Sequence, residues 1–284
     1  MFRTLVQRKR IQLVALLLLI VGIVVYAAGG IVYAGARIAS ADRTLNAVIS
    51  HQNTLNATFT DINTQLGVLN NNPSFKPQDA VALVDRSVAS SQLATTTINT
   101  DDASLRDAQS GLDQNRWLTM IGRGNLDRET ARISHARNAL AAARTVAADK
   151  VLEGKFWHSL YSGLSDLALL NSQSSSGDLA SARSTLNTMK AHIDQAATQS
   201  SAPPLPAELG NLMQDLQRFV SDYGKQLDAQ IAGDDAGVAT YQTSVQADLA
   251  RVAQYDFDAI SKKIVAFYKP LIDRFNTEIA AATT

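Results

Sequence analysis

The sequence predicts an all-α protein: a single N-terminal transmembrane helix followed by an elongated multi-helix bundle of long antiparallel helices. The run from Ile11 to Ala36 carries no charged residue, and apolar residues recur at helical spacings of three and four over most of the remaining chain. Alternating runs of β-branched and aromatic residues, which indicate strands, are missing. The 284 residues include only 15 Gly and 6 Pro, too few for an all-β fold with many turns.

The uncharged run at 11–36 is long enough to cross a bilayer. A helix needs about 20 apolar residues to span the hydrocarbon core, and this run has 26 residues. Tyr26 and Tyr33 lie in its second half, where amphipathic rings favour the membrane interface. We therefore expect a cytoplasmic tail at 1–10, a transmembrane helix at 11–36 and an extracytoplasmic helical domain at 37–284, with a possible sub-boundary near 122–126.

The flanking charges predict the orientation of the span. Four basic residues precede it, namely Arg3, Arg8, Lys9 and Arg10. No acidic residue occurs before Asp42. Because basic residues mark the cytoplasmic side, the sequence predicts a single-pass protein of the cell membrane with its N-terminus inside and its C-terminal domain outside. A cleaved signal peptide is the alternative, since Ala39-Ser40-Ala41 has the small-x-small pattern of a cleavage site. The length of the run favours the anchor, because secretory signal cores have about 7–15 residues.

The residues after the span predict a helix with one buried apolar seam. Two interleaved sets repeat every seven residues, which gives the alternating 3-4 spacing of such a seam. We expect the helix to end at the Asn-rich segment before Pro73, because Pro cannot continue it. The seam is expected to pack mainly inside the chain, and pairing with a second copy as a coiled coil is the alternative. The two sets are Leu45, Gln52, Phe59 and Leu66, and Val48, Leu55, Ile62 and Leu69.

Two long helices are predicted next. The first begins after Pro77, has a weak centre at 90–97 because Thr has a low helix propensity, and ends near 121–124. The second runs from about 127 to 170, with Gly154 as a candidate kink.

Two shorter helices and a long C-terminal helix complete the prediction. A Ser-rich loop at 171–177 and a Pro-rich linker at 200–206 separate them. The last helix is expected to start at 233–235, to run towards the C-terminus and to kink at Pro270, which removes a backbone donor. The two shorter helices are predicted at 178–197 and 207–231.

Composition excludes several classes of function. The 26 basic and 26 acidic residues balance, which removes the usual electrostatic footprint of a nucleic-acid-binding protein. The absence of Cys excludes thiol catalysis and thiolate metal sites. The four His have no metal-binding spacing, and no nucleophile or phosphate-binding motif occurs. We therefore predict no catalytic residue, no metal and no cofactor, and we expect the protein not to be an enzyme.

The densest local feature is an aromatic cluster. Phe156, Trp157, His158 and Tyr161 occur within six residues of one predicted helix. Aromatic side chains with a polar tip favour interfaces, so these four residues are the candidate surface for a partner or ligand. Core packing between helices is the alternative, because apolar stripes at helical spacing usually face a core.

These observations together predict a membrane-anchored extracytoplasmic protein that acts as a structural or protein-interaction module at the cell surface. Its expected contacts are membrane lipid through residues 11–36 and a protein partner or a second copy of the chain. A ligand-sensing ectodomain is the alternative. Because a tail of ten residues is too short for an output domain, such a sensor would have to work through a membrane partner.

Overall fold

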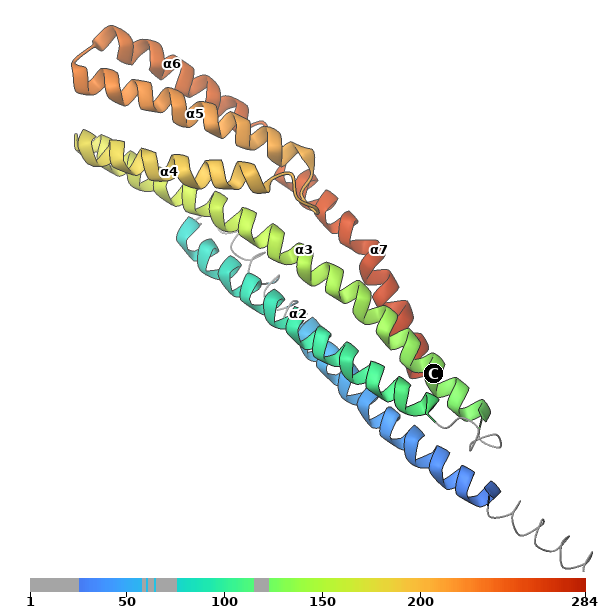
Figure 1. Ribbon diagram of the computed structural model, residues 1–284. Coiled ribbons are helices and arrows are strands. Elements are labelled where there is room, and N and C mark those ends of the chain that lie inside the picture. The colour runs from blue at the N-terminus through green and yellow to red at the C-terminus, as the bar shows by residue number, and fades with distance from the viewer. Residues whose placement is uncertain (1–25, 58–59, 61–63, 65–75, 115–122) are drawn as a thin grey trace, which may run out of the picture. The chain divides into compact units, whose positions relative to one another are not determined.

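A computed structural model describes residues 26–57, 60, 64, 76–114 and 123–284, and the regular elements in these ranges are all helices (Figure 1). The predicted all-α class is therefore confirmed. The first described helix covers residues 26–57. The other helices are α2 (Pro77–Asp113), α3 (Arg123–Ser175), α4 (Leu179–Gln199), α5 (Ala207–Ala232), α6 (Asp235–Val252) and α7 (Phe257–Thr283).

The predicted transmembrane helix lies mostly outside the described residues. Among the residues that are described, no helix is both long and apolar enough to cross a membrane. Residues 26–36, the outer end of the predicted span, are helical and continue without a break to residue 57. The span itself stays a prediction.

The weak centre predicted for α2 is wrong, because α2 is one continuous helix. Its Ser and Thr hydroxyls bond to the carbonyl four residues earlier instead of competing for a turn. Thr95 donates to Ser91 O at 2.9 Å, and Ser91 donates to Ser87 O at 2.8 Å. Ser91, Ala94 and Ile98 are buried, so tertiary packing stabilises the stretch despite its low propensity.

The prediction of a single C-terminal helix is also wrong, because residues 253–256 separate α6 from α7. Asp256 accepts a hydrogen bond from the Ala259 backbone N–H at 2.9 Å, which starts a new helix. Pro270 lies inside α7.

Tight turns join α3 to α4 and α5 to α6. The loop predicted at 171–177 is wrong over most of its length, because α3 continues to Ser175, whose hydroxyl donates back to the Asn171 carbonyl at 2.7 Å. Gly177 and Gly233 have positive φ values of 81° and 71°, the left-handed conformation in which Gly has no steric penalty. The Asp after each glycine is an N-cap: Asp178 accepts from Ser181 N and Asp234 from Gly237 N.

The chain divides into two compact units assembled from separated segments. Unit 1 contains the described residues of Met1–Asn53, Ile98–Ala141 and Phe275–Thr284. Unit 2 contains those of Thr54–Thr97 and Ala142–Arg274.

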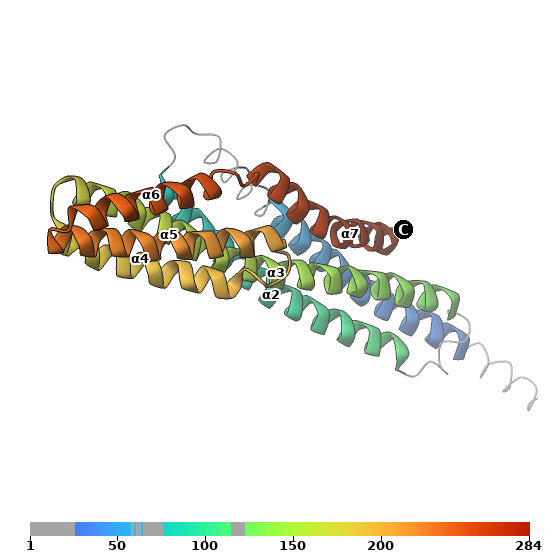
Figure 2. The same cartoon turned by 90° about the horizontal axis from the view of Figure 1, so that it is seen from above.

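Unit 1 has a narrow core between the helix at 26–57, the second half of α2 and the first half of α3. Figures 1 and 2 both show these three segments side by side. The predicted seam residues Leu45 and Val48 are buried, whereas the seam residues at 59, 62, 66 and 69 lie outside the described residues. Gln52 is buried, and its Nε2 donates to Asp101 Oδ2 of α2 at 3.1 Å. The seam therefore packs inside the chain over its described part. Other core residues are Ala41, Ile98, Leu105, Leu112, Leu126, Ile133, Ala136 and Leu140.

Unit 2 has a larger apolar core, with residues from α3, α4, α5, α6 and α7. The side chains of Phe156, Met189, Ile193 and Phe219 are fully buried in it. Gly154 lets α2 approach α3: a Cβ atom at this position would lie 2.4 Å from Val88 Cγ2. The candidate kink at Gly154 thus lies inside one uninterrupted helix, where the glycine provides space.

Replacing Gly154 tests this close approach. We expect Gly154→Ala to lower the free energy of unfolding by about 1–3 kcal/mol, the usual effect of an added methyl group in a packed contact. The clash should outweigh the gain of about 1 kcal/mol in helix propensity. Urea denaturation followed by circular dichroism measures the change. Combining Gly154→Ala with Val88→Ala should remove most of the clash.

Gly111→Ala is the matched control, because a Cβ atom there meets nothing within 4 Å in the same helix that contains Val88. It should leave the stability unchanged or slightly raised. Equal losses at positions 154 and 111 would contradict the close approach.

Candidate functional site

The predicted aromatic surface lies in the middle of α3, and its four residues separate into a buried and a partly accessible part. Phe156 is fully buried in the core of unit 2. Trp157 packs edge-on against Phe156, with ring centroids 5.0 Å apart, and stacks on Tyr161 at 5.8 Å. Burial raises the pKa of the Tyr161 hydroxyl. His158 is half-buried, and its Nδ1 lies 2.7 Å from Asp85 Oδ1 of α2.

This placement assigns Phe156 to packing, as the alternative interpretation of the cluster proposed. Trp157 packs against the core, and both Trp157 and Tyr161 are only partly buried. A partner at this surface could contact the outer sides of Trp157, His158 and Tyr161. The cluster's role in binding stays a prediction.

All four histidines of the sequence contact a carboxylate on another helix. Each uses its Nδ1 atom, at distances of 2.7–2.9 Å. The pairs are His51–Asp101, His135–Glu278, His158–Asp85 and His192–Asp166. Within the described ranges, no group of three or more His, Asp or Glu is placed to hold a metal ion. The histidines thus join helices in pairs.

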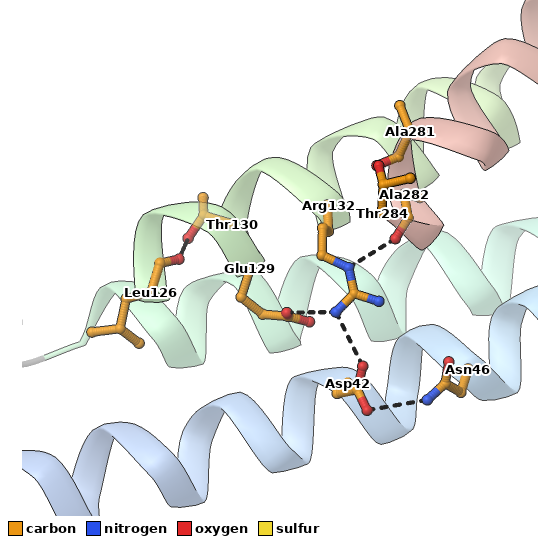
Figure 3. A network of polar contacts seen from close by, with 9 residues as sticks. All are labelled: Asp42, Asn46, Leu126, Glu129, Thr130, Arg132, Ala281, Ala282 and Thr284. Atoms are coloured by element: carbon orange, nitrogen blue, oxygen red, sulfur yellow. Dashed lines mark hydrogen bonds and ion pairs between the residues drawn. The ribbon is translucent and has the colours of Figure 1, made fainter. Parts of the chain in front are cut away.

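The main polar network of unit 1 centres on Arg132 of α3 (Figure 3). Its Nη1 donates to Glu129 Oε2 at 2.9 Å on the same helix and to Asp42 Oδ1 at 3.1 Å on the helix at 26–57. Its Nε donates to the backbone carbonyl of Ala282 in α7 at 2.9 Å. One guanidinium therefore joins three helices. Asn46, which donates to Asp42 Oδ2 at 3.1 Å, extends the network by one helical turn.

The electrostatics of this network follow from the burial of Glu129, which is only 4% exposed. Burial by itself lowers the pKa of Arg132, but the hydrogen bonds and charges of Asp42 and Glu129 outweigh it and raise that pKa above its ordinary value. Arg132 therefore stays charged and compensates Glu129. Sequence reasoning missed this site: the i,i+3 spacing of Glu129 and Arg132 is visible, but their meeting with Asp42 depends on the fold.

Unit 2 contains a second network, between α5 and the end of α6. Asp215 of α5 accepts a hydrogen bond from the Tyr255 hydroxyl at 2.8 Å and pairs with Arg218 at 3.1 Å. Arg251 of α6 pairs with Asp248 and lies 3.5 Å from Asp215. Burial raises the pKa of Asp248 despite the charge of Arg251. Burial, followed by the bond to Asp215, raises the pKa of Tyr255 to about 12.

A third contact connects α7 to α3 within unit 2. The Tyr268 hydroxyl donates to Glu153 Oε2 at 2.9 Å, and Lys150 pairs with the same oxygen at 2.8 Å. The Lys150 ammonium also lies 4.5 Å from the centre of the Tyr268 ring. Burial, then the nearby Glu153 carboxylate, raises the pKa of Tyr268 well above its usual range. The first and third networks therefore connect helices that are distant in sequence, whereas the second connects the consecutive helices α5 and α6.

Removing the charge of Arg132 should destabilise unit 1 strongly. Arg132→Met leaves the buried Glu129 carboxylate without its partner and releases the Ala282 carbonyl. We expect a loss of about 3 kcal/mol, at the low end of the range for a broken buried pair, because the Arg132 side chain keeps 20% exposure. Urea denaturation measures it.

Arg106→Met is the control, because Arg106 makes an exposed i,i+4 pair with Asp102. It should cost at most about 1 kcal/mol. The double variant Arg132→Met with Glu129→Gln should recover part of the loss, since no charge is then stranded. Similar losses for Arg132→Met and Arg106→Met would contradict the role assigned to the network.

The raised pKa of Tyr255 predicts that the stability of the protein depends on pH at high pH. Its pKa is raised from the usual value near 10 to about 12, so its contribution to stability is present below pH 10 and is lost as the pH rises towards 12. Tyr255→Phe should be less stable than the unchanged protein at pH 8. This difference should shrink between pH 10 and pH 12, as urea midpoints at several pH values can show.

Tyr241→Phe serves as the comparison, because in the part of the chain that the structure describes Tyr255, and not Tyr241, donates to Asp215. This variant should not reproduce the loss of stability that Tyr255→Phe shows at pH 8. A Tyr255→Phe difference that stays constant from pH 8 to pH 12 would rule out the hydrogen bond to Asp215.

Comparisons with protein-family models, with curated proteins and with solved structures found no match for this chain.

Proposed function

We propose that the chain is a single-pass membrane protein whose helical domain lies outside the cell and serves as a structural or protein-interaction module. The span at 11–36 would anchor it, with the four preceding basic residues on the cytoplasmic side.

One observation carries this proposal: the helix at 26–57 changes its environment along its length. Near its start, Ile31 and Val32 are 55% and 73% exposed. About two and a half to four turns later, Ala41 and Leu45 are buried in the core of unit 1. A membrane provides an apolar environment for the first part, whereas the protein core provides it for the second. This pattern supports a helix that leaves a bilayer and enters a folded domain.

The boundary between the two parts carries residues typical of a membrane surface. Arg37 is the first charged residue after the uncharged run, and its guanidinium lies 4.4 Å from the centre of the Tyr33 ring. Tyrosine rings are enriched at the level of lipid headgroups, and a cation over the ring adds to the interaction.

The same region supports an anchor that is retained. The candidate cleavage site Ala39-Ser40-Ala41 lies inside the continuous helix, and the Ala41 side chain is buried. Cleavage after Ala41 would remove Ala34, which is buried as well, and the hydrogen bond from Arg37 to Gln114 of α2. Unit 1 would thus lose part of its packing.

The interaction role rests on the outer surface of α7. Val265, Phe267 and Ile272 expose 41–64% of their area, while Ile260, Ile264 and Tyr268 of the same helix are buried. Exposed apolar side chains on a helix whose other face is fully packed favour contact with another protein. The ligand-sensing alternative stays a prediction.

Membrane extraction and protease accessibility test the proposal. The full chain, with a C-terminal tag and expressed in a bacterial host, should resist extraction by alkaline carbonate. Protease added to spheroplasts should remove the tagged domain. Leu17→Arg combined with Ile20→Arg should release the protein, because each charge at the centre of a span costs about 2.5–3.5 kcal/mol.

Leu93→Arg is the control, since Leu93 is 63% exposed on α2 and lies outside the predicted span. This variant should stay in the membrane fraction. A mature N-terminus at Asp42, or carbonate extraction of the unchanged protein, would overturn the anchor.

A further inference from the structure

We propose that one end of unit 1, where α2 ends and α3 begins, lies in the outer headgroup layer of the membrane and is a second lipid contact of the protein. This inference rests on the proposed span at 11–36. The contact surface consists of Gln114, Arg123 and Asn125 together with Tyr33 and Arg37 of the helix at 26–57.

The end of α2 lies level with the first charged residue after the span. Arg37 Nη2 donates to Gln114 Oε1 at 3.3 Å. Further along the same two helices, His51 meets Asp101 at 2.9 Å. As the residue number rises on one helix it falls on the other, so the two are antiparallel. α2 therefore runs towards the membrane and ends beside Arg37.

The start of α3 lies at the same level or slightly closer to the membrane. Asp42 and Arg132, which are 90 positions apart, are in contact. α3 is antiparallel to α2, since Arg137 binds Asp102 and Gly154 faces Val88. It is therefore parallel to the helix at 26–57, and residues 90 positions apart lie level. This register places Arg123 level with Tyr33 and Asn125 level with Gly35.

Tyr33 and Gly35, the residues level with the start of α3, belong to the predicted span and do not lie beyond it. Tyr33 is three residues before Ala36, or about 5 Å at 1.5 Å per residue. The uncharged run has 26 residues, whereas the hydrocarbon core needs about 20, so its last residues belong to the headgroup layer. The first turn of α3 must then lie in that layer too.

The side chains at this end suit lipid headgroups. Arg123, Asn125 and Arg128 are exposed, and an arginine can reach phosphate oxygens while its stem lies on apolar groups. Asp113 and Asp127, the exposed acids nearby, already have interaction partners.

A second contact would fix the orientation of unit 1. A domain held by one helix can tilt about the point where that helix leaves the membrane. With the α2–α3 end also in the headgroup layer, a tilt away from that end lifts Arg123 and Asn125 out of the lipid. Unit 1 would therefore present one defined face away from the membrane.

The absence of Cys allows a direct test with single environment-sensitive probes. Asn125→Cys, Gly35→Cys and Ser104→Cys are each labelled with the fluorophore NBD in the full chain. The proteins are reconstituted in vesicles of phosphatidylcholine and phosphatidylglycerol with shallow nitroxide-labelled lipid. Position 35 reports on the span, position 125 on the proposed contact, and position 104 on an exposed site of unit 1 away from it. Ser104 is ten positions before Gln114, or about 15 Å along α2.

We expect blue-shifted, strongly quenched emission at positions 35 and 125 and little quenching at 104. Adding Arg123→Glu to the Asn125→Cys protein should reduce the quenching at 125 without changing that at 35. Circular dichroism checks that each labelled protein keeps its helix content, and a labelled Arg128→Cys replaces Asn125→Cys if that variant does not fold.

The outcomes separate this inference from the proposed function. Quenching at 35 but not at 125 overturns the second contact and leaves the anchor in place. Equal quenching at 125 and 104 also overturns it, because the contact would then not be confined to this end. No quenching at position 35 overturns the span and, with it, the inference built on it.

Discussion

The packing of unit 1 depends on the compensation of one buried charge. Glu129 lies almost fully inside the unit, and an uncompensated carboxylate there would be strongly unfavourable. Arg132, one turn later on α3, supplies the opposite charge and brings Asp42 and the Ala282 carbonyl to the same place. The relative positions of the helix at 26–57, of α3 and of the end of α7 are therefore set by one guanidinium.

Unit 2 also contains buried carboxylates that are compensated by an arginine, near the segment that joins α6 to α7. Asp248 and Asp215 are buried carboxylates on facing helices, and Arg251 compensates both. Tyr255 reaches Asp215 only because the chain leaves helical geometry at 253–256. The chain thus gives up helical hydrogen bonds at 253–256, and the Tyr255 hydroxyl bonds to the buried Asp215 carboxylate instead. Asp256 then caps the start of α7. Residues 253–256 include no Gly or Pro, so the sequence does not indicate this break between helices.

This contrast shows what sequence patterns can predict here. Helices with strong apolar spacing and clear ends were placed to within a few residues: α5 was expected at 207–231 and covers Ala207–Ala232. The caps after Gly177 and Gly233 depend on neighbouring residues alone, so local sequence patterns suffice to indicate them. The joint at 253–256 and the continuity of α2 depend on tertiary contacts, which override local propensity.

For the candidate site too, local sequence predicts some features, and tertiary contacts decide the others. The sequence identified Phe156, Trp157, His158 and Tyr161 as the densest aromatic group, and they do lie together. Sequence spacing could not tell which of them faces the core, since that depends on what α3 packs against. The polar networks were invisible for a stronger reason: Arg132 and Asp42 are 90 positions apart, and no periodicity connects them.

Titratable side chains join the helices within each unit. Every histidine directs Nδ1 at a carboxylate of a neighbouring helix, and Glu153 and Asp215 likewise join helices. Side chains so used hold long helices in register within each unit.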